Sequence, residues 1–169
     1  MRGYLVFDGD NYRASAKDAN VELLPQHIDA RVQEIGREHQ IFFTRRVVFM
    51  SRHYRDYASR QWPLIEYEGS TDIEYRKYPI VGGHGYDDGQ IIDLLVRQRD
   101  EYEYLVMVTS DEDFFGCLKW LARSHGKRVL LLCMKGFTNE RSLRRLSPVQ
   151  YTWVQDIPVP ELAAACSPL

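Results

Sequence analysis

The sequence predicts an α/β fold in which a mainly parallel sheet is covered by helices on both faces. Short apolar runs without polar alternation, which are typical of strands buried on both faces, alternate with segments whose apolar residues recur at helical spacing. The chain has 169 residues, 44% of them hydrophobic, which is enough for one domain with a complete core. In such folds ligands bind at the carboxyl ends of the strands, so the residues that follow each apolar run are of special interest.

Four short apolar runs predict buried strands. They are residues 4–7, 47–50, 105–108 and 129–133. A further strand is expected over residues 73–78, within a stretch of mixed aromatic and charged residues, 52–81, whose boundaries the pattern leaves open. Alternation of these runs with helical segments indicates parallel pairing, because parallel strands need a crossover connection.

Three segments show the apolar spacing of an amphipathic helix. Residues 21–37 carry Leu24, Ile28, Val32 and Ile35 at that spacing, and residues 114–124 carry Phe114, Leu118, Leu121 and Ala122. The third helix is expected over residues 89–99. One domain over residues 1–155 is therefore predicted, and the proline-containing residues 156–169 are expected to form a surface tail or linker.

Composition narrows the function classes. The formal net charge is -2 and the pI is about 6.2, so any contact with a nucleic acid has to come from a local basic patch. No apolar run is long enough for a signal peptide or a membrane span, which predicts a cytoplasmic protein without membrane contact. Cys117, Cys133 and Cys166 lie too far apart for a zinc site or a disulfide framework, so three unpaired thiols in a reducing compartment are expected.

Aspartates follow or interrupt the apolar segments at four places. They are Asp8, the pair Asp87 and Asp88, Asp93, and the pair Asp111 and Asp113. Carboxylates gathered at one edge of a sheet repel one another unless a divalent cation neutralises them. An all-oxygen ligand set favours Mg²⁺ or Mn²⁺, which can acidify bound water and polarise a phosphodiester. The sequence therefore predicts a metal centre suited to phosphodiester hydrolysis.

Each aspartate taken alone also has a simpler explanation, since Asp is common at helix N-caps and in turns. Three acidic sites in register at the strand ends are harder to explain in that way. Asp93 differs from the others because it interrupts an apolar helical stretch, where an ionised carboxylate needs a partner. It either faces the metal pocket or pairs with an arginine.

The motifs and their order resemble those of the NYN domains, which belong to the PIN-like nuclease superfamily. Residues 5–11, Leu-Val-Phe-Asp-Gly-Asp-Asn, are similar to the opening Asp-Gly-x-Asn motif of that family. Residues 109–114 and 126–129 resemble its later Ser-Gly-Asp-x-Asp-Phe and Gly-Lys-x-Val elements. Tyr-Asp-Asp at 86–88 resembles a motif of the zinc-finger-linked NYN ribonucleases, while Asp87 with Asp93 fits the LabA-like branch. The resemblance extends over residues 4–155, and residues 142–143 and 151–154 fit the closing helix and strand.

The resemblance implies a three-layer α/β/α fold and a Mg²⁺- or Mn²⁺-dependent endoribonuclease. By position, the catalytic and metal-binding residues would be Asp8, Asp87, Asp88 and Asp111. Asp93 and Asp113 would complete or support the metal pocket, and Asn11 would orient Asp8 or contact the substrate. Ser110 stands where the family has glycine, and Gly83-His84-Gly85 replaces a usual lysine. These two departures affect groups that would position phosphate.

Cations interleaved with aromatic residues indicate where single-stranded or structured RNA could bind, because cations follow the phosphate backbone and aromatic rings stack on bases. Arg52 and Arg55 lie in such a segment, as does Lys77, and Arg141, Arg144 and Arg145 follow later. Arg52, Arg55 and Lys77, together with Asn11 and Ser110, are the candidate substrate contacts. A solvated face is the commoner meaning of such runs.

Two other functions stay open. The first is a module of the same fold without turnover, which binds RNA or a protein through its sheet edge. Under either function, a homodimer is a possible form of the protein. The second is a receiver-like phosphotransfer domain, which also gathers aspartates at strand ends. That class needs a lysine after a late strand, and Lys135 follows the run at 129–133.

Overall fold

A computed structural model describes residues 1–21, 25–51, 73–78, 80–81, 84–85 and 87–157. Within them, six strands form one parallel sheet in the order β3-β2-β1-β6-β7-β8. The strands are β1 (Arg2–Asp8), β2 (Phe42–Ser51), β3 (Ile73–Tyr78), β6 (Tyr104–Val108), β7 (Arg128–Cys133) and β8 (Gln150–Trp153). A small antiparallel pair, β4 (Ile80–Val81) and β5 (His84–Gly85), lies outside this sheet.

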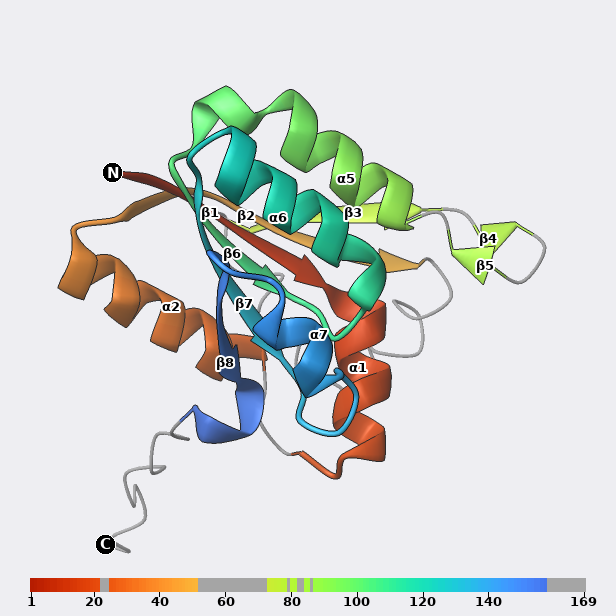
Figure 1. Cartoon of the computed structure of the whole chain (residues 1–169). Coiled ribbons are helices and arrows are strands. Elements are labelled where there is room, and N and C mark those ends of the chain that lie inside the picture. The colour runs from red at the N-terminus through yellow and green to blue at the C-terminus, as the bar shows by residue number, and fades with distance from the viewer. Residues whose placement is uncertain (22–24, 52–72, 79, 82–83, 86, 158–169) are drawn as a thin grey trace, which may run out of the picture.

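Helices cover both faces of the sheet, so the predicted three-layer α/β/α fold is confirmed (Figure 1). One face carries α5 (Asp87–Arg97), α6 (Phe115–Ser124) and the short α7 (Glu140–Arg144). The other carries α1 (Gly9–Asp18) and α2 (Pro25–His39). Alternate residues of β1, β2, β6 and β7 enter the two cores: in β1, Val6 packs toward α5 and α6, whereas Phe7 packs toward α1 and α2. The inner parts of these four strands are therefore apolar on both sides, because neither face is open to water there.

The direction of the chain through the sheet reverses between β1 and β6. From β1 it moves outward through β2 to β3, and then returns to β6 on the other side of β1 before it continues to β7 and β8. The helices that follow β1 and β6 lie on opposite faces. The carboxyl ends of these strands adjoin, with Phe7 paired to Val108. Such a switch point leaves a crevice in which α/β proteins bind ligands.

Each predicted strand lies within an observed one, and β3 has the predicted bounds of residues 73–78. The second strand begins at Phe42 rather than Val47, because residues from Phe42 onward pair with β1 although several are polar. The helix expected from residue 21 begins at Pro25, a residue suited to the first helical position. The predicted tail lies almost wholly outside the described residues, which end at Ile157.

Cys117 and Cys133 are free thiols, as predicted, and Cys166 lies outside the described residues. No helix in the part of the chain that the structure describes is long and apolar enough to cross a membrane.

Stability is expected to fall at alkaline pH because buried acids keep their protons in the folded state. Burial raises the pKa of Cys133 to about 12 from an ordinary 9.0, and raises the pKa of Tyr12 and Tyr102 above their ordinary 10.0. Above about pH 9 the unfolded chain therefore loses protons that the folded chain still holds, and the free energy of unfolding decreases. Urea unfolding at pH 8 and pH 10 measures this decrease. Cys133→Ala should show a shallower pH dependence, and a flat wild-type profile would contradict the expectation.

Candidate metal centre

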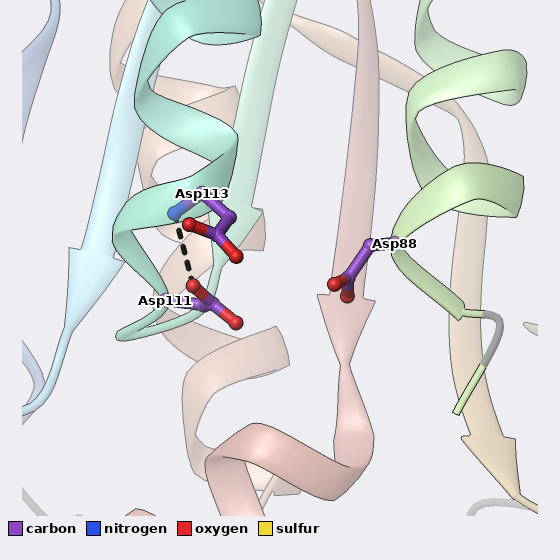
Figure 2. A group of neighbouring side chains, drawn as sticks. All are labelled: Asp88, Asp111 and Asp113. Atoms are coloured by element: carbon purple, nitrogen blue, oxygen red, sulfur yellow. Dashed lines mark hydrogen bonds between the residues drawn. The ribbon is translucent and has the colours of Figure 1, made fainter. Parts of the chain in front are cut away.

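Three aspartates come together at the carboxyl edge of the sheet. They are Asp88 in the first turn of α5, Asp111 in the loop after β6, and Asp113 in the 3-10 helix η2 (Glu112–Phe114). Each offers a carboxylate oxygen, and these atoms all lie within 4.8 Å of one another. Figure 2 shows Asp88 directed across from α5 toward the other two. Asp88 and Asp111 are half-buried and Asp113 is exposed, so the group is open to solvent.

Local backbone geometry explains the positions of Asp111 and Asp113. Asp111 caps η2, and its Oδ1 accepts a hydrogen bond of 2.9 Å from the backbone N–H of Asp113. The capping explanation considered for each aspartate therefore applies to Asp111. Capping uses one carboxylate oxygen, so it is compatible with a second role for the same side chain. Asp88 lies at a helix N-terminus, where the helix dipole stabilises a negative charge.

Asp8, predicted as a metal ligand together with Asp111, does not belong to this three-residue group. Its side chain is 1% exposed and caps α1, with Oδ1 accepting from the backbone N–H of Asn11 at 3.2 Å. Its Oδ2 accepts from Thr109 Oγ1 at 2.9 Å, and Thr109 Oγ1 accepts in turn from the backbone N–H of Asp111 at 3.1 Å. Asp8 therefore lies behind the group and fixes the Asp111 backbone through Thr109.

Asn11 and Ser110 join the two halves of the switch point. The Asn11 side chain accepts a hydrogen bond of 2.8 Å from the backbone N–H of Ser110, which ties α1 to the loop after β6. Ser110 is buried, and its Oγ accepts from the backbone N–H of Met134 at 2.9 Å. Both residues were predicted to contact substrate. In the structure the Ser110 side chain is instead buried and holds the backbone at Met134.

Asp93 lies away from the acidic group. It is on the exposed side of α5, its side chain is 53% exposed, and its Oδ1 is 2.5 Å from Arg97 Nε, one helical turn later. Of the two roles considered for Asp93, pairing with an arginine is confirmed, and the place in the metal pocket is wrong. The reason is helical geometry, because Ile91, Leu94 and Leu95 turn toward the core and leave Asp93 on the outside.

Several predicted site residues lie beyond what the structure describes. Arg52 and Arg55 are outside the described residues, and so are the side chains of Asp87 and Lys77. Their backbones are placed, with Asp87 at the start of α5 and Lys77 in β3 opposite Met50 of β2. The predictions for these four residues stay predictions.

Sequence reasoning gave no role to three residues that support the site. Thr109 connects Asp8 to Asp111, as described above. Thr138 donates to the carbonyl of Ser110 at 3.3 Å, and Glu112 Oε1 accepts from the backbone N–H of Asn139 at 2.9 Å. For Thr109, the sequence offered one signal of such a role, namely a hydroxyl side chain directly before Ser110 and Asp111. Nothing in the sequence pattern connects Thr138 or Glu112 to partners so far along the chain.

The donor set fits a hard divalent cation. It contains only carboxylate oxygens, which suit Mg²⁺ or Mn²⁺ better than softer metals. Oxygen ligands lie about 2.1 Å from Mg²⁺, so opposite ligands are about 4.2 Å apart. The carboxylate oxygens of the three aspartates lie within 4.8 Å of one another, which is slightly wider than this spacing. Rotation of the partly exposed side chains can bring the oxygens to it. Three neighbouring negative charges also give a cation a strong electrostatic attraction to this place.

Comparison with known proteins supports the fold alone. No protein-family model matches the sequence, and no curated protein matches it. A solved structure of a protein of unknown function from Vibrio parahaemolyticus is similar, with a TM-score of 0.68 at 12% sequence identity. The similarity covers 92% of this chain and 93% of the other. The arrangement of strands and helices is thus shared over nearly the full length of both chains.

Proposed function

We propose that this protein is a Mg²⁺- or Mn²⁺-dependent endoribonuclease that hydrolyses phosphodiester bonds in RNA. The observation that carries the proposal is the convergence of Asp88, Asp111 and Asp113 within 4.8 Å at the switch point of the sheet. These residues come from separate elements, α5 and the segment after β6, so their proximity is a product of the fold. Carboxylates so close to one another repel, and a bound cation would offset that repulsion.

The sequence motifs support the same proposal. Asp88 lies in the Tyr-Asp-Asp segment, and Asp111 and Asp113 lie in the Thr-Ser-Asp-Glu-Asp-Phe segment, both of which resemble NYN-domain motifs. We therefore also propose membership of that family. The resemblance and the geometry are independent in one respect, because the motifs specify residue types and order, whereas the fold decides which carboxylates meet.

Each residue has a definite part in the proposed reaction. Asp88, Asp111 and Asp113 would hold the ion, which when bound supplies an acidified water and stabilises negative charge on the phosphate. The Thr109 hydroxyl and the capping bond to Asp113 keep Asp111 in place. The buried Asp8 would act indirectly, since it holds Thr109, whose hydroxyl oxygen accepts from the Asp111 backbone N–H. The half-exposed position of the group leaves access for a polymer.

Removal of the metal and of one ligand tests the proposal. Cleavage of a labelled single-stranded RNA is expected with Mg²⁺ or Mn²⁺ and not with EDTA. Asp88→Asn should lower the rate by more than about ten-fold, since even residues that only orient metal ligands are worth about 10- to 100-fold. Asp93→Asn, which makes the same charge change at an exposed position of the same helix, should leave the rate unchanged.

Three outcomes would overturn the proposal. Cleavage that persists in EDTA, or that Asp88→Asn leaves intact, would show that the acidic group is not the catalyst. RNA binding without cleavage under every metal condition would favour the alternative of a binding module of the same fold.

A further inference from the structure

Residues 135–145 form a basic stretch in this slightly acidic chain. Lys135, Arg141, Arg144 and Arg145 are all exposed, and Glu140 is the one acidic residue between Lys135 and Arg145. Glu140 comes within 3.8 Å of Arg144, and their side chains are 58% and 77% exposed, respectively. Because this ion pair is open to solvent, it neutralises little of the positive charge. The stretch itself therefore carries a net positive charge, although the chain as a whole has a net charge of -2.

The three arginines of this stretch share one side of α7. Arg141, Arg144 and Arg145 are spaced i, i+3 and i+4, which places them together on a helix surface. Leu143 lies on the opposite side and is 1% exposed within the core, so packing fixes how the helix is turned. The Asn139 side chain caps the helix by accepting from the backbone N–H of Arg141 at 2.9 Å. The guanidinium groups thus extend from a firmly seated helix into water.

An exposed aromatic ring lies on the turn that precedes α7. Phe137 is 40% exposed, and its backbone N–H donates to the carbonyl of Met134 at 3.2 Å. Gly136 takes a φ of 93°, which suits glycine and allows the chain to turn sharply before the ring. Gln155 braces the start of the turn through bonds of 3.0 and 3.2 Å to the backbone of Lys135. The ring is therefore presented on a preorganised turn, which lowers the entropic cost of binding.

The same hydrogen bonds connect this turn to the acidic group. Thr138 donates to the carbonyl of Ser110, and the Asn139 N–H donates to Glu112 Oε1. Ser110 and Glu112 are the two neighbours of Asp111 in the chain. The basic surface and the acidic group consequently belong to one rigid network at the carboxyl edge of the sheet.

We propose that Lys135, Phe137, Arg141, Arg144 and Arg145, here called the α7 patch, bind single-stranded RNA and lead it to the acidic group. The cations would contact successive phosphates and Phe137 would stack on a base. Stacking on a protruding ring requires an unpaired base, which favours a single strand over a duplex. The inference that the RNA is led to the acidic group rests on the proposed function. Binding itself does not, because the patch acts without a metal.

Fluorescence polarisation with a short fluorescein-labelled single-stranded RNA, at low salt and in EDTA, tests the patch. Phe137→Leu keeps an apolar side chain but removes the flat ring, and it should weaken binding by about five-fold or more. Phe137→Trp should restore it. Arg144→Ala should reduce the slope of log affinity against log salt by about 0.7, the change expected for one lost phosphate contact on a single strand.

Two matched controls separate the patch from general effects. Phe42 is 74% exposed at the start of β2, and Phe42→Leu should leave RNA binding unchanged. Arg97, with a side chain 78% exposed at the end of α5, is the arginine control, and Arg97→Ala should keep the salt slope. Equal weakening by Phe42→Leu and Phe137→Leu would overturn the inference, as would wild-type protein that does not bind the RNA at low salt.

The two proposals fail separately. If Phe137→Leu weakens RNA binding but the wild type does not cleave in Mn²⁺, the α7 patch stands and the nuclease proposal fails. If the wild type cleaves in Mn²⁺ but Phe137→Leu changes neither the affinity nor KM, the α7 patch is wrong and the nuclease proposal stands.

Discussion

Asp111→Asn is expected to reduce divalent-metal-dependent RNA cleavage by more than about a hundred-fold, because it removes a charged ligand rather than a residue that orients one. Asparagine has nearly the same shape as aspartate, and its side-chain oxygen can still accept the capping bond from the N–H of Asp113. The loss is therefore attributable to the charge. Single-turnover rates in saturating Mn²⁺ measure it.

The same substitution should have the opposite effect on stability without metal. Asp111 is close to Asp88 and Asp113, and loss of its charge relieves their repulsion. Because the group is partly exposed, the gain in free energy of unfolding should be at most about 1 kcal/mol. In Mn²⁺ the order reverses: the wild type gains about 2.7 kcal/mol at a hundred times its Kd, and the variant gains far less. Urea unfolding in EDTA and in Mn²⁺ gives both values.

Asp100→Asn is the matched control for this substitution. Asp100 is exposed in the 3-10 helix η1 (Arg99–Glu101), outside the acidic group, so the variant should keep both the cleavage rate and the stabilisation by Mn²⁺. If Asp111→Asn instead lowered the metal-free stability and kept the response to Mn²⁺, Asp111 would be a capping residue and nothing more.

The centre of the sheet could be predicted from the sequence because its strands carry runs that are apolar on both faces. Residues 105–108, for example, have no polar member and are fully buried in β6. Helix α1 could not be predicted in the same way, since its buried positions are Gly9, Tyr12, Ser15 and Ala16. These residues carry little hydrophobic signal, and tertiary packing rather than amphipathicity places the helix.

The candidate site was predictable in location and in part in membership, because the predicted set includes Asp88, Asp111 and Asp113 but also Asp8 and Asp93, which lie outside the group. A run that ends in aspartate shows that Asp8 and Asp111 lie at one edge of a parallel sheet, and the structure agrees. The sequence does not show where a carboxylate points, and the oxygens of Asp8 are directed to the α1 N-terminus and Thr109. Asp113, expected to complete or support the pocket, is a full member of the group. Its place depends on how η2 turns after the Asp111 cap.

Phe114→Ala is expected to lower the free energy of unfolding by about 3–5 kcal/mol, the usual cost of deleting a buried phenyl ring. Phe114 is 0% exposed and lies in the core cluster that also contains Ile91 of α5 and Leu118 of α6. Phe114→Leu fills most of the space and should cost less. Phe42→Ala, which removes a ring that is 74% exposed, should change stability by no more than about 0.5 kcal/mol. Urea unfolding in EDTA compares the three variants.

This substitution also tests whether core packing sets the geometry of the acidic group. Phe114 directly follows Asp113, and its core cluster joins η2 to α5, the helix that carries Asp88. A cavity under η2 should let Asp113 move relative to Asp88, and Mn²⁺ affinity should fall by about ten-fold in protein that is still folded. Unchanged affinity alongside the loss of stability would mean that the Asp111 cap alone holds η2 in place. Isothermal titration with Mn²⁺ well below the unfolding temperature separates these cases, because it measures the affinity of the folded protein for the ion without requiring turnover.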